Sequence, residues 1–422
     1  MKINLLILLF TFFIISCDDE NNTINDNPDI EGEYFKFTKS EVIEANKLFD
    51  SLDGKNWIFK SGWPMIEDSL MKLSYLLNIK GIKAFITDSV FVKDSTIYTI
   101  SISSINLSYN DLEGLMPEIN LDNLDTLNLG NNDIYGNIPD INLPKLSFIN
   151  FSHNKFDGEV PNFSSKILRY IDINYNFLVG SLPNLDMENL VALDVSSNNL
   201  SGNLDNLKLP SLELLSIANN DFEGIITQYN FPNLRTLKLS NNKFTGELHG
   251  FIENPLLQVL DISDNQLEGN LQSLTDKKLN HLNLANNNLS GDIPLFTQSF
   301  DYQVINEVDS TLKDTTALYM QNLYVGYNNF NFKNLEANAE LIYNYSYESQ
   351  NYELVLEDKG NNILSAKMEG EFNIYQWYKD GKEIEGETNI EIVATTSGSF
   401  YCIVGNTKLG NLKFQSNTLE IE

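Results

Sequence analysis

One stretch of this sequence decides its fold: Leu127-Asn128-Leu129-Gly130-Asn131-Asn132-Asp133-Ile134-Tyr135-Gly136. Its pattern, L-x-L-x-x-N-x-[L/F/I]-x-G, recurs nine times, with steps of 22 residues and a single step of 23. A repeat of this length predicts a solenoid whose units stack and share one core. The asparagines of the pattern are Asn110, Asn132, Asn154, Asn176, Asn198, Asn220, Asn242, Asn265 and Asn287, and each is followed four residues later by a glycine.

Each unit divides its residues between a strand and a turn. Leu127 and Leu129 alternate with polar neighbours, which is the period-two pattern of a short strand. The side-chain amide of Asn132 has two donors and an acceptor, enough to bridge backbone groups of adjacent turns. Gly136 permits backbone angles that other residues avoid. Because one unit buries too little apolar surface to offset its conformational entropy, only stacked units fold.

The repeated pattern resembles the leucine-rich repeat family, in its extracellular plant-like subtype with L-x-G-x-I-P in the second half of the unit. The resemblance covers about residues 97–332 and implies a mostly β solenoid, an arc or horseshoe of short parallel strands with little helix. Leu323, Val325 and Asn328 fit a tenth unit after an insertion near residues 298–320. We therefore expect about ten repeats over residues 97–348.

The N-terminus predicts export and anchoring. Residues 1–16 are expected to be a signal peptide, since the apolar run from Leu5 to Ile15 is too short to span a membrane. Ile14-Ile15-Ser16-Cys17 resembles the lipobox of bacterial lipoproteins, which implies lipid on Cys17 and membrane contact through that lipid only. A plain signal peptide is the alternative.

Residues 17–33 are expected to be a flexible acidic tether, because their composition cannot bury a core. The run Asp18-Asp19-Glu20 resembles a signal, found in some Gram-negative lineages, for export to the outer face of the outer membrane. The expected location is therefore the outer membrane, facing the cell exterior. The alternative is a solvated acidic spacer facing the periplasm.

Two smaller modules flank the repeats. Residues 34–96 begin with a predicted helix after Thr38, and the segment from Leu48 to Trp63 resembles the N-terminal cap of extracellular leucine-rich repeat proteins, without the cysteine pair often found there. Trp57 and Trp63 are expected to cover the open end of the core.

Residues 349–422 are predicted to form a small β-sandwich. The segments from Gln376 to Gly381 and from Gly398 to Cys402 resemble an immunoglobulin-like domain, which implies Trp377 as its core tryptophan. The cysteine that would pair with Cys402 is missing near Leu364 or Ala366. We therefore expect a buried, apolar thiol at Cys402.

Composition and motifs argue against catalysis and against metal or cofactor binding. The histidines His153, His249 and His281 lie at no metal-ligand spacing, and no G-x-S-x-G, H-E-x-x-H or P-loop pattern is present. We expect no enzyme, cofactor or metal site. The net charge of −30, from 28 basic and 58 acidic side chains, argues against nucleic acid and anionic lipid surfaces as partners.

Strand residues that alternate with the inward leucines are expected to form the concave face, where a ligand would bind. Aromatic side chains gather there in units one, three and four, beside an arginine, as in binding hot spots. The predicted ligand-binding residues are Tyr109, Phe148, His153, Arg169, Tyr170 and Tyr175, with Arg235 and Lys238 as a secondary candidate. The alternative is that these rings pack on each other or shield the cap.

The predicted function is non-covalent recognition of a protein or peptide by a cell-surface lipoprotein. Because aromatic rings flanked by asparagine and aspartate also suit sugars, a carbohydrate-binding adhesin is one alternative. A structural spacer that presents the C-terminal module is another.

Overall fold

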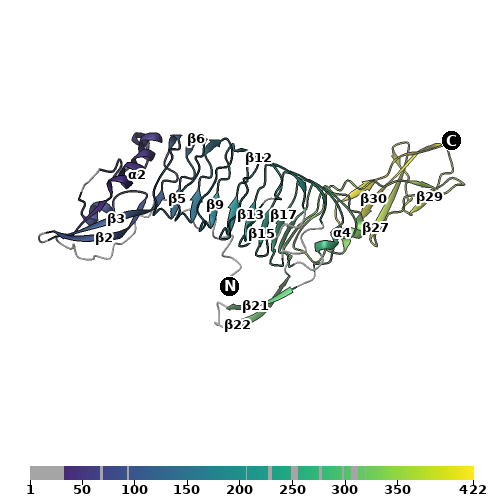
Figure 1. The fold of residues 1–422 in the computed structure, drawn as a ribbon. Helices are drawn as coiled ribbons and strands as arrows, with labels where there is room; N and C mark the ends of the chain where they lie inside the picture. The colour runs from purple at the N-terminus through teal and green to yellow at the C-terminus, as the bar shows by residue number, and fades with distance from the viewer. Residues whose placement is uncertain are drawn as a thin grey trace. The chain divides into compact units, whose positions relative to one another are not determined.

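The structure is a computed structural model that describes residues 33–66, 70–92, 95–205, 207–226, 231–248, 255–274, 278–296, 299–305, 312–318 and 320–422. The predicted signal peptide and Cys17 lie outside the described residues. The chain divides into two compact units, residues 1–157 with 161–165, and residues 158–160 with 166–422. Each unit contains stacked coils joined by parallel strands, so the prediction of a mostly β, leucine-rich-repeat-like solenoid is confirmed (Figure 1).

The first unit begins with the cap. Thr38 starts its main helix, as predicted, by accepting a hydrogen bond from the Glu41 amide, and the helix buries Val42, Ala45, Leu48 and Phe49. A long antiparallel hairpin then leads into the first repeat strand. The cap elements are β1 (Glu33–Phe37), α2 (Lys39–Ser51), η1 (Gly54–Asn56), α3 (Leu73–Leu76), β2 (Ile82–Val92) and β3 (Ser95–Asn106).

Aromatic packing and hydrogen bonds join the cap to the first coil. Trp57 and Trp63 are buried, and their ring centroids lie 5.3 Å apart in an edge-on arrangement. The backbone of Phe59 donates to Oδ1 of Asn110 and accepts from its Nδ2. The cap therefore supplies the backbone partners that a preceding coil would otherwise give to the first repeat asparagine.

The repeat strands of the first unit form two parallel ladders. β3 pairs with β5 (Thr126–Asn128), and β5 pairs with β7 (Phe148–Asn150). A second ladder lies after the repeat asparagines and joins β4 (Glu113–Leu115), β6 (Asp133–Asn137) and β8 (Lys155–Asp157).

The second unit also contains two parallel ladders. Its main sheet runs through β9 (Tyr170–Asp172), β11 (Ala192–Asp194), β13 (Leu214–Ser216), β15 (Thr236–Lys238), β17 (Val259–Asp261), β19 (His281–Asn283), β23 (Asn322–Tyr324) and β24 (Asn344–Ser346). The other ladder runs through β10 (Val179–Gly180), β12 (Asn199–Gly202), β14 (Asp221–Ile225), β16 (Lys243–Glu247), β18 (Gln266–Gly269) and β20 (Asn288–Leu289). A short η3 (Gln272–Leu274) follows β18.

Buried or half-buried asparagine side chains connect coils of each unit to the coil before them. The Oδ1 of Asn220 accepts from the Leu200 amide at 2.9 Å, and its Nδ2 donates to the Val195 and Ile217 carbonyls at 3.1 Å each. These bonds satisfy backbone groups that leave the strand and have no ladder partner. The same pair of links to the preceding coil recurs at Asn132, Asn154, Asn198, Asn242, Asn265, Asn287 and Asn328.

An eleventh coil, which the repeat pattern did not reveal, ends the solenoid. β24 pairs with β23 so that Tyr345 lies opposite Leu323, and Gln350 takes the place of the asparagine. Its Oε1 accepts from the Phe330 amide at 3.2 Å, and its Nε2 donates to the Val325 carbonyl at 2.9 Å. A glutamine thus makes the same two links as the asparagines, with a longer side chain.

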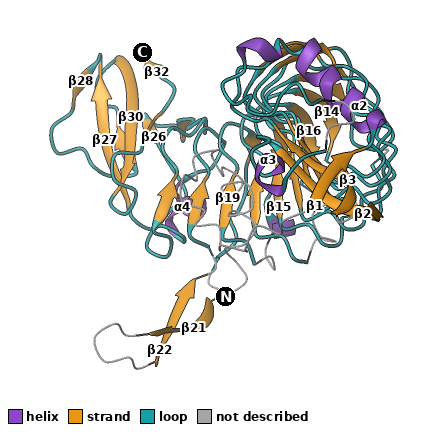
Figure 2. Cartoon of the chain, turned by 90° about the vertical axis from the view of Figure 1, so that its left-hand side faces the viewer, coloured by secondary structure: helices purple, strands orange, loops and turns teal. Residues whose placement is uncertain are grey.

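The insertion near residues 298–320 contains a β-hairpin. β21 (Ser299–Ile305) and β22 (Leu312–Leu318) pair antiparallel with each other, and Figure 2 shows them as a two-stranded ribbon of their own.

The C-terminal residues form two small antiparallel sheets. Trp377 is fully buried, lies opposite Cys402 in the strand register, and donates from its indole nitrogen to the Asn389 carbonyl at 2.8 Å. The immunoglobulin-like identity of this part stays a prediction. One sheet contains β25 (Glu357–Asp358), β26 (Ile363–Ser365) and β29 (Glu391–Val393), and the other contains β27 (Asn373–Lys379), β28 (Lys382–Glu383), β30 (Gly398–Asn406), β31 (Lys413–Gln415) and β32 (Leu419–Ile421).

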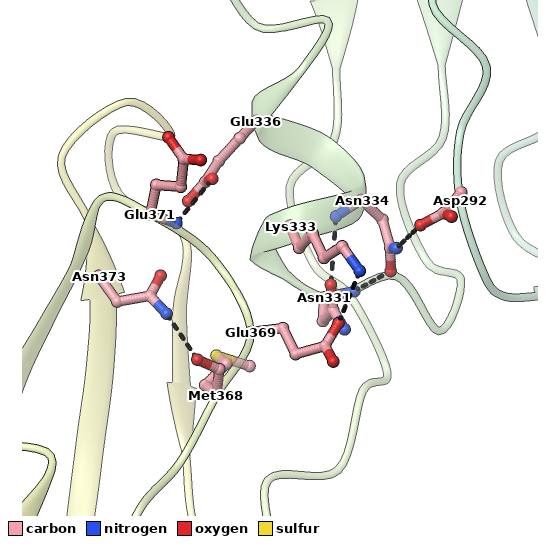
Figure 3. Close-up of polar contacts among 9 residues, drawn as sticks. All are labelled: Asp292, Asn331, Lys333, Asn334, Glu336, Met368, Glu369, Glu371 and Asn373. Atoms are coloured by element: carbon pink, nitrogen blue, oxygen red, sulfur yellow. Dashed lines mark hydrogen bonds and ion pairs between the residues drawn. The ribbon is translucent and has the colours of Figure 1, made fainter.

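A short helix of the tenth coil, α4 (Phe332–Glu336), holds these sheets against the solenoid (Figure 3). The Glu336 carboxylate accepts from the Glu371 amide at 3.0 Å and the Phe372 amide at 3.3 Å, and also from the Asn406 side chain. On the same helix, the Phe332 ring meets Phe414 edge-on, with centroids 4.9 Å apart. Since one carboxylate accepts bonds from two segments of the C-terminal sheets, this junction is built as part of the unit and is not a free linker.

We predict that Asn220→Ala destabilises the protein by about 3 kcal/mol, because it leaves one amide and two carbonyls without the bonds described above. The measurement is denaturant unfolding followed by circular dichroism. Asn233→Ala is the matched control, since that side chain makes one exposed bond to the Pro210 carbonyl and its removal should cost well under about 1 kcal/mol. Equal unfolding midpoints for the two variants would contradict the stabilising role of the asparagine side-chain links.

Candidate functional site

We call the series of repeat asparagines, together with Gln350 of the last coil, the asparagine ladder. The residue just before each ladder side chain defines what we call the turn column. In all eleven coils this residue has a positive φ, between 49° and 63°. Left-handed backbone suits asparagine best among residues with a side chain and disfavours bulky ones. The column contains Tyr109, Asn131, His153, Tyr175, Ser197, Asn219, Asn241, Asp264, Asn286, Tyr327 and Ser349.

Aromatic rings occupy four places in this column, and three of them were predicted as site residues. In the first unit these are Tyr109, 48% exposed, and His153, also exposed. In the second unit they are Tyr175, 53% exposed, and Tyr327, 55% exposed. The sequence alone shows the rings but not the left-handed backbone that holds them.

The remaining predicted residues lie beside the turn column in each unit. Phe148 is half-buried on β7 of the first unit. In the second unit, Tyr170 is half-buried on β9, and the Arg169 guanidinium carbon lies 5.8 Å from its ring centroid. The structure thus brings Arg169 and Tyr170 together, whereas a single patch that also includes Phe148 stays a prediction.

The secondary candidates differ in their surroundings. The Nε of Arg235 pairs with a carboxylate oxygen of Glu213 at 3.3 Å, and both side chains are partly exposed. Lys238 is exposed on β15 and lies opposite Asp261 of β17 in the strand register. Arg235 is therefore engaged within the scaffold, while Lys238 presents its charge on the strand face.

Two carboxylates lie on neighbouring strands of the main sheet of the second unit. Asp172 lies opposite Asp194 in the register of β9 and β11, and its Oδ1 accepts from the Asn174 amide at 3.2 Å. Burial, with the negative charge of Asp194 as a second cause, raises the pKa of Asp172 to about 8, although the Asn174 bond opposes the shift. The Asp172 carboxyl is therefore largely protonated at neutral pH.

A hollow of about 520 Å³ lies at the C-terminal end of the sheet, and sequence reasoning did not find it. We call it the C-terminal hollow. It spans four coils and is lined by Asp261, His281, Asn283, Ala285, Tyr324, Gly326, Tyr327, Ser346, Glu348 and Ser349. Tyr324 and Tyr327 continue the face positions beyond the insertion, and this was the signal available in the sequence. The position of Glu348 could be assigned only after the eleventh coil was known.

Sequence comparison places leucine-rich repeats in this chain. A leucine-rich repeat model matches residues 233–255 and 278–300, and a second matches residues 253–270. The chain carries leucine-rich repeats. A search of curated proteins finds no match.

Plant proteins are among the similar solved structures. The plant peptide hormone receptor RGFR1 in complex with RGF2 is 32% identical over 45% of this chain and 40% of its own, with a TM-score of 0.36. The Arabidopsis receptor kinase HAESA, in complex with the peptide hormone IDA and the co-receptor SERK1, is 24% identical over 59% and 49%, with a TM-score of 0.43. A plant ice-binding protein is 21% identical over 60% and 88%, with a TM-score of 0.43. This chain thus spans less than half of the length of the two receptor chains.

In the part of the chain that the structure describes, no three His, Cys, Asp or Glu side chains gather in an arrangement suited to a metal ion. Over the same residues, none of the helices combines the length and the apolar character needed to cross a membrane.

The raised pKa of Asp172 predicts a pH-dependent stability. Because the folded state binds a proton that the unfolded state releases between pH 4 and 8, the free energy of unfolding should fall as pH rises through that window. Asp172→Asn removes this dependence. It should be the more stable protein at pH 8.5, by at least about 1.4 kcal/mol, the equivalent of one pKa unit.

The measurement is chemical denaturation of both proteins at several pH values from 4 to 8.5. Glu223→Gln, at an exposed position of β14, is the control and should follow the wild-type profile. Parallel profiles of unfolding free energy against pH for the wild type and Asp172→Asn would contradict the raised pKa of Asp172.

Proposed function

We propose that this protein is a non-enzymatic surface protein that recognises a protein or peptide partner through the face of its solenoid formed by the repeat strands. The observation that carries the proposal is the presence of exposed aromatic rings in the turn column. Tyr109, Tyr175 and Tyr327 all combine a positive φ with a ring about half exposed. The backbone conformation and the exposure of these rings both oppose folding stability.

The backbone itself does not require a ring at these positions. Asn131, Asn219, Asn241 and Asn286 adopt the same left-handed conformation in other coils, at lower conformational cost. Backbone strain of this kind is concentrated at functional sites. Rigid aromatic side chains also supply the large contact areas of binding hot spots. A role in recognition explains why the rings stand where asparagine would be more stable.

The charge of the protein narrows the class of partner. With a net charge of −30, the protein attracts cationic partners over long range and repels nucleic acid. A basic protein or peptide is therefore the favoured class. Because this attraction is screened by salt, the association rate should fall as ionic strength rises.

The test compares two tyrosines of similar exposure. A screen of the purified protein on surface-protein, peptide and glycan arrays first identifies a ligand. Tyr175→Asn should then weaken binding about 30-fold, the loss typical of a hot-spot residue, while raising folding stability by up to about 1 kcal/mol. Tyr135→Asn, at a 45% exposed tyrosine of β6 outside the turn column, should change neither.

Two results would overturn the proposal. One is a protein or peptide ligand whose affinity survives both Tyr109→Asn and Tyr175→Asn. The other is a set of hits confined to glycans, which would instead establish the carbohydrate-binding alternative.

We further propose that the protein is an exported lipoprotein anchored through Cys17, in the outer membrane and facing the exterior. The lipobox-like sequence supports this, and Cys17 lies outside the described residues. Cys402, the other cysteine of the sequence, is buried, and its burial raises the pKa of the thiol to about 12. A thiol held protonated in this way is a poor nucleophile. Cys17 is thus the cysteine suited to modification.

Lipid attachment is tested by expressing the protein in a Gram-negative host supplied with a clickable fatty acid. Label should be incorporated into the wild type and into Cys402→Ser, and it should be lost in Cys17→Ser. Protease treatment of intact cells then reports the face of the membrane. Label that persists in Cys17→Ser would refute anchoring at this residue.

A further inference from the structure

Small residues open the C-terminal hollow. In the position two residues before the ladder side chain, Ser263 is followed on successive coils by Ala285 and Gly326. A Cβ at Gly326 would lie 2.7 Å from the Glu348 carbonyl oxygen, which is closer than contact allows. Glycine is therefore required there by the close approach of the next coil. The result is a recess flanked by larger side chains.

Aromatic rings form one side of the recess. The rings of His281 and Tyr324 come from adjacent strands, and their centroids lie 5.6 Å apart. Burial lowers the pKa of His281, although the Asp261 charge opposes the shift, and Lys238 adds to it; the neutral imidazole is therefore favoured. Tyr327 adds a third ring, more than half exposed. The ring faces carry the partial negative charge that attracts a cation.

Carboxylates stand at both ends of the recess. Asp261 comes from β17, where its Oδ1 accepts from the Ser263 amide at 3.2 Å and hydroxyl at 2.8 Å. Glu348 comes from the eleventh coil and is exposed. Among the described residues that line the hollow there is no lysine or arginine. Lys238 lies one strand beyond Asp261, outside the lining.

We propose that the C-terminal hollow binds the cationic side chain of an arginine or lysine residue in the partner. This inference rests on the proposed function and names the chemistry that the partner presents. A guanidinium group stacks on aromatic faces and pairs with carboxylates through directed hydrogen bonds, and an ammonium group satisfies the same two features as a point charge. The hollow places three rings and two carboxylates around one recess, which suits such a group.

The test uses small blocked amino acids as probes, so that it does not depend on the natural ligand. Saturation-transfer NMR measures the binding of Nα-acetyl-L-arginine amide and Nα-acetyl-L-lysine amide to the purified protein. Nα-acetyl-L-citrulline amide has almost the same shape as the arginine probe but no charge. We expect the cationic probes to bind in the millimolar range and the citrulline probe to bind at least about 10-fold more weakly, because it lacks the cation–π and ionic attraction.

Three variants locate the binding. Glu348→Gln, at an exposed position, should weaken the arginine probe about 5-fold. Tyr324→Leu should weaken it by a similar factor through loss of a ring face. Glu223→Gln on β14 is the matched control and should leave affinity unchanged. Equal binding of the citrulline probe, absence of binding, or affinity unchanged in Glu348→Gln would each overturn the inference.

The array screen of the proposed function gives an independent result. If the screen yields a peptide that depends on Tyr175 but the arginine probe does not bind, only the inference about the hollow fails. If the probe binds at the hollow and the hits of the screen are confined to glycans, the hollow stands as a cation site and the proposed function fails.

Discussion

The solenoid depends on one interaction, the hydrogen bonding of a buried side-chain amide to the backbone of the coil before it. At the point where each coil turns away from the sheet, backbone groups enter the interior without strand partners, and Asn198 shows how they are satisfied. Its side chain accepts from the Leu178 amide and donates to the Ile173 carbonyl. Because each link reaches only the neighbouring coil, the structure grows by repetition of a local solution. The same kind of link joins Asn110 to the backbone of Phe59 in the cap, and in the last coil Gln350 makes it to the Phe330 amide.

The asparagine ladder also determines where the proposed binding residues lie. The amide points inward from a tight turn, and in every coil the residue before it adopts the left-handed conformation. That position faces solvent and favours asparagine, so each ring placed there opposes the scaffold's own preference. In a stacked array such a cost acts mainly on one coil and its neighbours, while the other coils keep their ladder links. Tyr109 and Tyr175 are therefore tolerated by the fold although they are not favoured by it.

The sequence predicts the parts of this structure that come from short-range pattern. Leucine spacing gives the strands, the asparagines give the ladder, and Thr38 gives the start of the cap helix. The last coil escapes prediction because tyrosines replace its leucines and Gln350 replaces its asparagine. In physical terms the replacement works because a longer amide reaches the same backbone groups. The repeat pattern specifies residue types, whereas folding of a coil requires only apolar side chains at the leucine positions and an amide at the asparagine position.

The candidate sites show a second limit of prediction from sequence. Reading the strand columns identifies Arg169 and Tyr170 as neighbours, and the structure places them in contact distance for a cation–π interaction. The hollow depends instead on what side chains leave empty: Gly326 is small because the Glu348 carbonyl of the next coil approaches it. That constraint arises between coils whose register the insertion obscures. In a solenoid, the sequence therefore predicts which positions carry core side chains. A recess forms where a small residue of one coil lies next to the larger side chains of the adjacent coil.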